Sequence, residues 1–181
     1  MTKLRLLLIL LSAALTLTGC STLSESECAV GNWYQIGFKD GKRGKDSDYV
    51  IEHESSCAEY GVFIDREEYE QGRQRGLDQY CVGANGYQRG SSGSYPNQSC
   101  SQRYVDYHQS YYDGLLARYD SLQITLEELH KEHEILRQVI RRIDDEEEIE
   151  RLNLELDEID DDIDSVQSSL TRTRNLLDRF R

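Results

Sequence analysis

The sequence predicts a mainly α-helical protein with a small disulfide-stapled helical head followed by a long antiparallel coiled-coil hairpin. Three observations support this fold class. A short apolar run near the N-terminus ends in a cysteine, and every other cysteine lies in residues 28–118. That same segment holds every glycine except Gly19. Residues 119–181 contain no Gly, Pro or Cys and follow a heptad pattern.

The composition excludes two broad classes of protein. Hydrophobic residues make up 38% of the 181-residue chain, and its mean hydropathy of −0.69 is too low for a protein with several membrane spans. The formal net charge of −13 argues against nucleic acid as the main partner, because phosphate binding needs a basic surface.

Residues 1–19 have the pattern of a signal peptide. Lys3 and Arg5 precede an apolar run from Leu6 to Leu17. A helix of that length covers roughly 18 Å, against about 30 Å of hydrocarbon, so it is too short to span a bilayer. The sequence Leu17-Thr18-Gly19-Cys20 that follows resembles the lipobox of bacterial lipoproteins. The resemblance implies a diacylglycerol thioether on Cys20, cleavage before it, and N-acylation, for example with palmitate.

This interpretation predicts a location. Ser21 follows the lipidated cysteine, where Asp would favour retention in the inner membrane. We therefore expect a lipid anchor in the outer membrane, with the chain facing the periplasm and residues 20–27 acting as a lipidated tether. The opposite face of the outer membrane and inner-membrane retention stay open as alternatives.

Four cysteines remain after the anchor: Cys28, Cys57, Cys81 and Cys100. An even number in an exported chain indicates two disulfides, with three possible connectivities. The sequence contains no C-x-x-C pair for a zinc site. We predict that Cys28 pairs with Cys57 and that Cys81 pairs with Cys100, because each pair then closes a helical hairpin with the shortest chain.

Capping signals predict short helices in the head, residues 28–118. Asp65 is a candidate N-cap with Glu68 three residues later, and this helix would run to Tyr80. Gly61 would end a preceding helix over residues 49–60. The Gly/Ser/Asn-rich segment 83–97 is expected to be a loop, ordered by a disulfide.

An inexact repeat runs through the head. Its copies are Tyr34, Gly37 and Gly41; Tyr69, Gly72 and Gly76; and, in reduced form, Tyr111 and Gly114. Positions i, i+3 and i+7 share one face of a helix. Glycine inside a helix costs about 1 kcal/mol relative to alanine, and close approach by another helix or a tyrosine ring would offset this cost. The alternative is that these glycines only break helices.

These motifs together resemble a bacterial lipoprotein family classed as a domain of unknown function (domain of unknown function 2799). The matching residues are Cys28, Trp33 to Gly44 (WYQIGFKDGKRG), Cys57, Tyr69 to Cys81 (YEQGRQRGLDQYC), Gly86 to Tyr95 and Cys100, followed by the heptad tail. The resemblance covers roughly residues 20–118 and implies location and architecture, but no mechanism. It also suggests Trp33, Asp40 and Asp78 as a recognition surface, although Trp33 suits the core better.

The tail predicts two paired helices. Apolar seam positions alternate by three and four at Tyr119, Leu122, Leu126, Leu129, His133, Leu136, Ile140 and Ile143, and again at Ile149, Leu152, Leu156, Ile159, Ile163, Val166, Leu170, Thr173, Leu177 and Phe180. The step of six from Ile143 to Ile149 breaks the pattern and predicts a turn near 144–148, with Asp144 or Asp145 capping the second helix. The alternative is one continuous helix in an intermolecular coil.

Candidate metal ligands are few. His53-Glu54-Ser55-Ser56-Cys57 matches a zincin motif with Cys in place of the second His, a match we attribute to chance. His130 and His133 could share a metal, but His133 lies on the heptad seam. Thirteen acidic residues between 144 and 164 form no EF-hand pattern. We expect no catalytic, cofactor-binding or metal site.

The leading functional hypothesis is a non-catalytic structural or interaction protein of the cell envelope, with a membrane anchor and a protein partner bound through the coiled coil. The rival is an envelope glycan- or peptide-binding protein, or a hydrolase, that uses the aromatic and glycine-rich head. A third hypothesis, metal handling, rests on the acidic stretch and the histidine pair.

Overall fold

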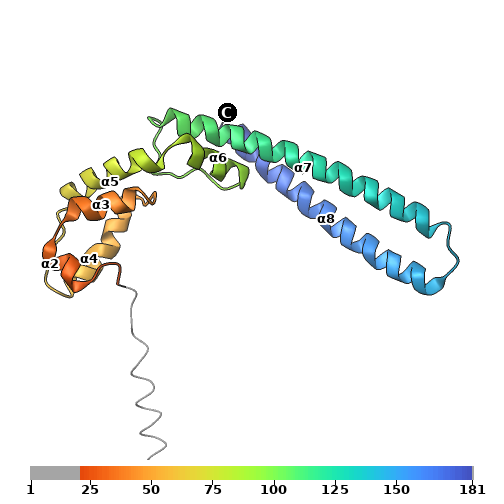
Figure 1. Cartoon of the computed structure of the whole chain (residues 1–181), viewed down its shortest axis with the longest axis horizontal. Helices are drawn as coiled ribbons and strands as arrows, with labels where there is room; N and C mark the ends of the chain where they lie inside the picture. Colours follow the sequence, from red (N-terminus) through yellow and green to blue (C-terminus); the bar gives the residue numbers. More distant parts are fainter. Residues whose placement is uncertain (1–20, 181) are drawn as a thin grey trace, which may run out of the picture. The chain divides into compact units, whose positions relative to one another are not determined.

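The computed structural model describes residues 21–180, and its regular elements there are all helices (Figure 1). The expected mainly α-helical class is confirmed. The predicted signal peptide and Cys20 lie outside the described residues. The chain divides into two compact units between Tyr80 and Cys81. None of the described helices is both long enough and apolar enough to cross a membrane.

Unit 1 consists of α2 (Glu25–Val30), α3 (Trp33–Gly41), the 3-10 helix η2 (Ser47–Tyr49), α4 (Val50–Ala58) and α5 (Arg66–Tyr80). The predicted N-cap at Asp65 is present, because its Oδ1 accepts hydrogen bonds of 3.0 Å from the backbone N–H groups of Glu67 and Glu68. Gly61 follows α4 as expected, and its N–H donates to the carbonyl of Ala58.

Residues 21–27 are folded and do not form the polar tether that the sequence suggested. Ser24 caps α2 through a capping box with Glu27, and Leu23 is buried. Leu23 packs in one hydrophobic cluster with Cys28 and Val50. The polar composition of this segment reflects its capping residues, and its one buried leucine fixes it to the core.

The disulfides follow the predicted connectivity of neighbouring cysteines. Cys28 is bonded to Cys57 in unit 1, and Cys81 is bonded to Cys100 in unit 2. The first bond joins α2 to α4, and the second joins the segment before α6 to the loop before α7. Each unit is thereby closed within itself.

Close packing of α3 against α5 forms the centre of unit 1. A Cβ atom added at Gly37 would lie within 3.0 Å of the Tyr69 carbonyl, and one added at Gly72 would lie equally close to the Tyr34 backbone. The backbones of the two helices therefore touch directly, which offsets the low helix propensity of glycine. The first two copies of the sequence repeat are the two faces of this contact.

Unit 2 consists of α6 (Gly83–Ser91), α7 (Val105–Ile140) and α8 (Glu146–Arg179). Helix α6 occupies much of the segment that we expected to be a loop. A Cβ atom at Gly86 or Gly90 would lie within 3.0 Å of the carbonyl of Tyr107 or Tyr111 on α7. The glycines that suggested a loop are needed for a helix–helix contact instead.

The two units repeat the same arrangement. Gly37 and Gly41 of α3 contact α5 as Gly86 and Gly90 of α6 contact α7. Equivalent turns follow at Gly44 (φ 71°) and Gly93 (φ 68°), in the left-handed region that glycine adopts without strain. The following residues then accept equivalent bonds: Arg73 Nη1 donates to Lys45 O, and Tyr111 Oη donates to Ser94 O, each at 3.0 Å. The chain therefore holds two copies of a Cys–helix–Cys–helix unit.

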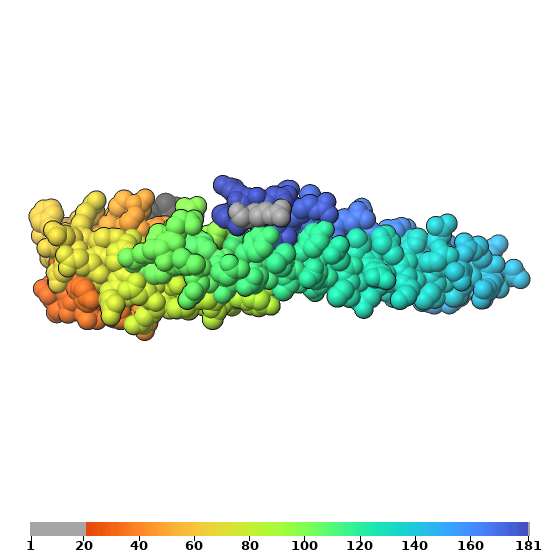
Figure 2. Space-filling view, turned by 90° about the horizontal axis from the view of Figure 1, so that it is seen from above, coloured from red at the N-terminus to blue at the C-terminus, as the bar shows by residue number. Residues whose placement is uncertain are grey.

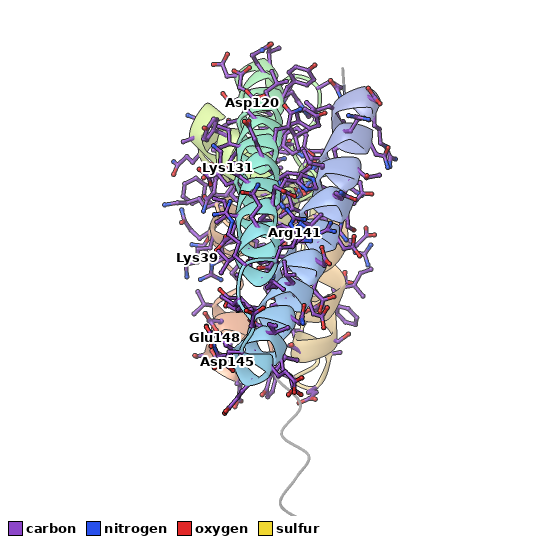
Figure 3. The ribbon with its side chains drawn as sticks, turned by 90° about the vertical axis from the view of Figure 1, so that its right-hand side faces the viewer. Lys39, Asp120, Lys131, Arg141, Asp145 and Glu148 are labelled. Carbon is purple, nitrogen blue, oxygen red and sulfur yellow. A yellow bond between two sulfur atoms is a disulfide. The ribbon has the colours of Figure 1, made fainter. Side chains whose placement is uncertain are left out.

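Helices α7 and α8 form the predicted antiparallel hairpin (Figure 1), and Figure 2 shows the C-terminal part of α8, in blue, lying against α7, in green. Every predicted seam position from 119 to 180 is buried or half-buried. The turn lies just before Asp145, which caps α8 by accepting from the N–H groups of Glu147 and Glu148 (Figure 3). The capping residue and the fold-back agree with the sequence prediction.

Helix α7 runs without interruption through residue 118, where the composition changes from head to tail. Its first part packs on α6 and its remainder packs on α8. The proposed head and hairpin therefore share one helix, and the boundary between compact units lies at Tyr80 and Cys81 instead.

Candidate functional site

The structure buries two of the three residues suggested as a recognition surface. Trp33 is 6% exposed and belongs to the core cluster with Leu23, and Asp40 is 4% exposed. Neither side chain is available at the surface. Asp78 is partly exposed and accepts a hydrogen bond of 3.2 Å from Arg75 on the same helix.

Asp40 is the centre of a buried polar network. Its Oδ2 atom lies 2.7 Å from Nε2 of His53 and accepts a hydrogen bond of 3.1 Å from the Tyr69 hydroxyl. On its other side, His53 Nδ1 lies 2.7 Å from Oγ1 of Thr22. The backbone N–H of Thr22 donates to Oγ of Ser56 at 3.0 Å. Three helices, α3, α4 and α5, and the segment before α2 thus converge on one carboxylate–imidazole–hydroxyl chain.

The protonation pattern of this chain follows from its partners. A carboxylate only accepts hydrogen bonds, so the proton between the two side chains lies on Nε2 of His53, which donates to Asp40. Nδ1 of His53 faces the hydroxyl of Thr22. The rings of Tyr49 and Tyr69 enclose the imidazole at centroid distances of 5.0 and 5.9 Å. Burial, and then the charge of Asp40, raise the pKa of Tyr69 well above its usual value, so this hydroxyl remains a donor.

The order carboxylate, imidazole, hydroxyl is the order of a hydrolase triad. In this network, however, Thr22 is held at both its hydroxyl and its backbone N–H. Asp40, His53 and Thr22 line none of the cavities described below for residues 21–180. The geometry supports a clamp that fastens the start of the folded chain to α4. Sequence reasoning missed it because its members lie far apart, and the separate patterns that singled out His53 and Asp40 did not connect them.

The candidate metal ligands do not converge. His53 faces Asp40, Cys57 is in a disulfide, and Glu54 is paired with Arg66. On the hairpin, His133 lies 3.4 Å from Asp160 of α8. Within residues 21–180, no group of three His, Cys, Asp or Glu side chains is placed to hold a metal ion.

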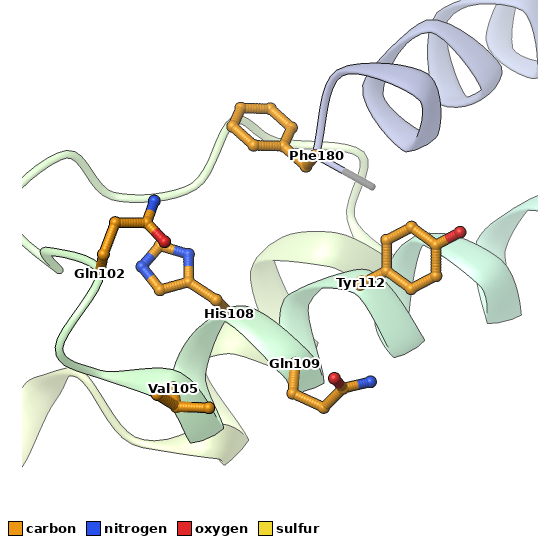
Figure 4. A pocket seen from close by; sticks show the side chains of 6 residues that line it. All are labelled: Gln102, Val105, His108, Gln109, Tyr112 and Phe180. Carbon is orange, nitrogen blue, oxygen red and sulfur yellow. The ribbon is translucent and has the colours of Figure 1, made fainter.

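Unit 2 contains two adjoining cavities that the sequence did not indicate. Their volumes are about 440 and 390 Å³, and both are lined by Gln102, His108 and Phe180 (Figure 4). Tyr112 lines the smaller cavity and Arg179 lines the larger. The described lining combines aromatic rings, carboxamides and one guanidinium, without a carboxylate. Such a surface suits a polar ligand with apolar ring faces.

The walls of these cavities are held in place. The ring of Phe180 packs edge-to-face on Tyr111, with centroids 5.6 Å apart. His108 Nε2 lies 2.9 Å from the carbonyl oxygen of Cys100, whose disulfide fixes the loop. The N–H of Asn97 in the same loop donates to the Tyr107 hydroxyl at 2.8 Å. The signal available in the sequence was Phe180 at the end of the heptad seam, which only the fold brings to this loop.

Comparison with known proteins identifies the part of the chain that forms the paired helices. The model of a family described as a protein of unknown function (DUF2799) matches residues 32–116. Residues 32–116 are thus similar to the DUF2799 family. The matched segment starts at Asn32, the N-cap of α3, and ends one residue after the buried Leu115. It therefore contains both glycine-packed helix pairs and ends before the arm, defined here as residues 117–179 of α7 and α8 with their turn.

No curated protein matches the chain. No solved structure matches it either. The match to DUF2799 agrees with the family that the sequence motifs suggested. The family's description names no activity.

Proposed function

We propose that this protein is a lipid-anchored, non-catalytic interaction protein of the bacterial outer membrane that faces the periplasm. Cys20 carries the anchor, and the arm binds an envelope protein. The observation that carries the proposal is the arm itself. Its two helices bury one seam against each other and leave their other faces to solvent. From residue 117 to Ile140 the arm reaches about 36 Å beyond the glycine-packed pair.

The shape of the arm suits a helical partner. Ile135 on α7 is 58% exposed and Leu154 on α8 is 63% exposed. A third helix laid along the hairpin would cover such side chains, as helices do in bundles and coiled coils. Single exposed apolar residues are common on surfaces, so the arm's length and its open faces carry more weight than these two side chains.

Two experiments test this proposal. First, cells fed labelled palmitate should label the wild-type protein and should not label the Cys20→Ala variant, which remains an unprocessed precursor. Labelling of that variant, or a freely soluble wild-type protein, would refute the anchor.

Second, a photo-crosslinking amino acid at Ile135 should capture an envelope protein in intact cells. The same residue at the buried Leu152 should not, which provides a matched control on the same arm. Equal crosslinking at both positions, or at neither, would count against the arm as the binding surface.

The second candidate function is binding of an envelope glycan or peptide, and the cavities beside Phe180 are the observation that favours it. Tyr112 and Phe180 offer ring faces, and Arg179 would pair with a carboxylate. Titration of the protein with muropeptides should shift resonances of His108 and Phe180 and leave those of unit 1 unchanged. A Phe180→Ala variant that binds equally well would exclude this site.

A further inference from the structure

The described part of the chain begins immediately after the proposed anchor residue. The Ser21 hydroxyl donates to the carbonyl of Leu23 at 2.5 Å, and Thr22 is bound through its backbone and side chain to α4. Leu23 is 6% exposed and lies in the core of unit 1. The described part of the chain therefore has no free linker after Ser21.

Chain geometry limits how far unit 1 can stand from the bilayer. The Cα atoms of Cys20 and Thr22 are two residues apart, which spans at most about 7 Å. The headgroup layer on each side of a bilayer is itself about 5 to 7 Å thick. The eight-residue tether expected from the sequence would have allowed about 28 Å. A lipid on Cys20 thus holds unit 1 against the headgroups.

Unit 1 exposes two large apolar side chains that could meet the bilayer. Phe63, in the turn between α4 and α5, is 93% exposed, and Val30 at the end of α2 is 76% exposed. The neighbours of Phe63, Val62 and Ile64, pack against the cluster that contains Leu23. Phe63 therefore projects from the same core to which the anchored end is fastened.

A shallow cleft adjoins the second of these side chains. Val30 lines it with Ile36 and Lys39, and its volume is about 300 Å³. The long side chain of Lys39 can keep its ammonium group at the headgroups while its stem lies along apolar surface. Glu59 and Asp65 lie close to Phe63 in sequence, so insertion of the ring, and not attraction to anionic lipid, would hold this surface.

We propose that unit 1 rests directly on the membrane, with Phe63 and Val30 inserted at the level of the lipid headgroups. The partner of this surface is a phospholipid bilayer. The inference depends on the proposed lipidation of Cys20, and it adds that the helical unit docks on the bilayer and is not suspended from it. The clamp formed by Asp40, His53 and Thr22 is what keeps the connection short.

The test places a fluorescent probe on the docking surface of the full-length, lipidated protein in phosphatidylethanolamine and phosphatidylglycerol vesicles. Phe63→Trp is compared with Gln79→Trp, whose exposed position lies about 20 Å further along α5. Brominated phospholipids quench a tryptophan that contacts the bilayer. The buried Trp33 contributes the same background to each variant, and the wild-type protein measures that background.

We expect quenching of the probe at 63 to exceed quenching of the probe at 79 by at least twofold, with little change between low and high salt. Val30→Trp provides an independent second probe with the same expected result. Inserting ten Gly/Ser residues between Ser21 and Thr22 should reduce quenching at both positions, although the lipid anchor is retained.

The possible results separate the docking surface, the short connection and the anchor. Vesicle-bound protein in which positions 63 and 79 are quenched equally would overturn the docking surface. Undiminished quenching after the insertion would overturn the role of the short connection. Protein that carries no lipid and does not sediment with vesicles would instead refute the proposed anchor, and the two failures are therefore distinguishable.

Discussion

Replacing Gly72 by alanine tests the direct contact between the α3 and α5 backbones. The added Cβ atom would lie 2.8 Å from the carbonyl carbon and 2.9 Å from the Cα atom of Tyr34. These are backbone atoms of a helix, so no side-chain rotation relieves the clash. The two helices must move apart, and the packing along their whole contact loosens.

The magnitude follows from two opposing effects. Alanine has a helix propensity about 1 kcal/mol better than that of glycine, which alone would stabilise α5. Overpacking a tight contact costs about 1 to 3 kcal/mol, and a clash with backbone on both sides belongs at the upper end of that range. We therefore expect Gly72→Ala to lower the free energy of unfolding of unit 1 by about 2 kcal/mol.

Trp33 makes this measurable, because the chain's one tryptophan is buried in unit 1. Urea unfolding of the oxidised protein, followed by Trp33 fluorescence, reports on this unit. Gln71→Ala is the matched control, since it places alanine on the solvent face of α5 one residue earlier and should leave stability within about 0.5 kcal/mol. A Gly72→Ala protein as stable as the wild type would refute the close backbone contact.

Four further predictions concern other parts of the structure. Replacing Cys28 and Cys57 together by serine opens a loop of 29 residues and should cost about 3 to 4 kcal/mol in the same urea assay; a loss under 1 kcal/mol would contradict this. Asp40→Ala leaves buried polar partners without an acceptor and should cost about 3 kcal/mol, whereas an unchanged urea midpoint would show the network to be dispensable. Burial raises the pKa of Tyr111 to about 12, whereas an unfolded tyrosine ionises near pH 10. The stability that Tyr111 contributes below about pH 10 should therefore be lost as the pH rises towards 12. Unfolding followed by circular dichroism should show this loss, and a stability that does not change with pH would exclude the coupling. Leu176→Ala should cost about 3 kcal/mol and speed amide exchange at the end of α8, and exchange unchanged from the wild type would place Leu176 outside the core.

The arm was the most predictable part of the fold. Its seam repeats by three and four over many turns, and the break between Ile143 and Ile149, followed by acidic capping residues, favours a turn. Local signals of this kind act between residues close in sequence. The helix start at Asp65 was predictable for the same reason, because a cap and its N–H donors lie within three residues.

Helix α6 was missed because its sequence has the composition of a loop. The segment GANGYQRGS contains three glycines, and glycine alone gives no sign of whether it frees the chain or admits a neighbour. Gly86 and Gly90 allow α6 to contact the backbone of α7, and helix propensity does not include the free energy of such a contact. The repeat in the sequence was visible, but its pairing was not, since the spacing Tyr-x-x-Gly-x-x-x-Gly occurs on both partners of one contact.

The candidate site depended most on long-range placement. Asp40, His53 and Thr22 are separated by 13 and 31 residues, and none belongs to a motif that links it to the others. The cavities of unit 2 join a loop to a phenylalanine more than seventy residues later. Sequence patterns identified the cysteines that hold these segments, but not the side chains that meet once they are held.

The continuity of α7 has a mechanical consequence. A helix of 36 residues is about 54 Å long and resists bending, because every turn is tied to the next by hydrogen bonds. Its first turns are gripped by α6 and its last turns end at the tip of the arm. A sideways displacement at the tip is therefore transmitted along α7 to its glycine contact with α6. Deflection of the arm would therefore load the contact of Gly86 and Gly90 with α7.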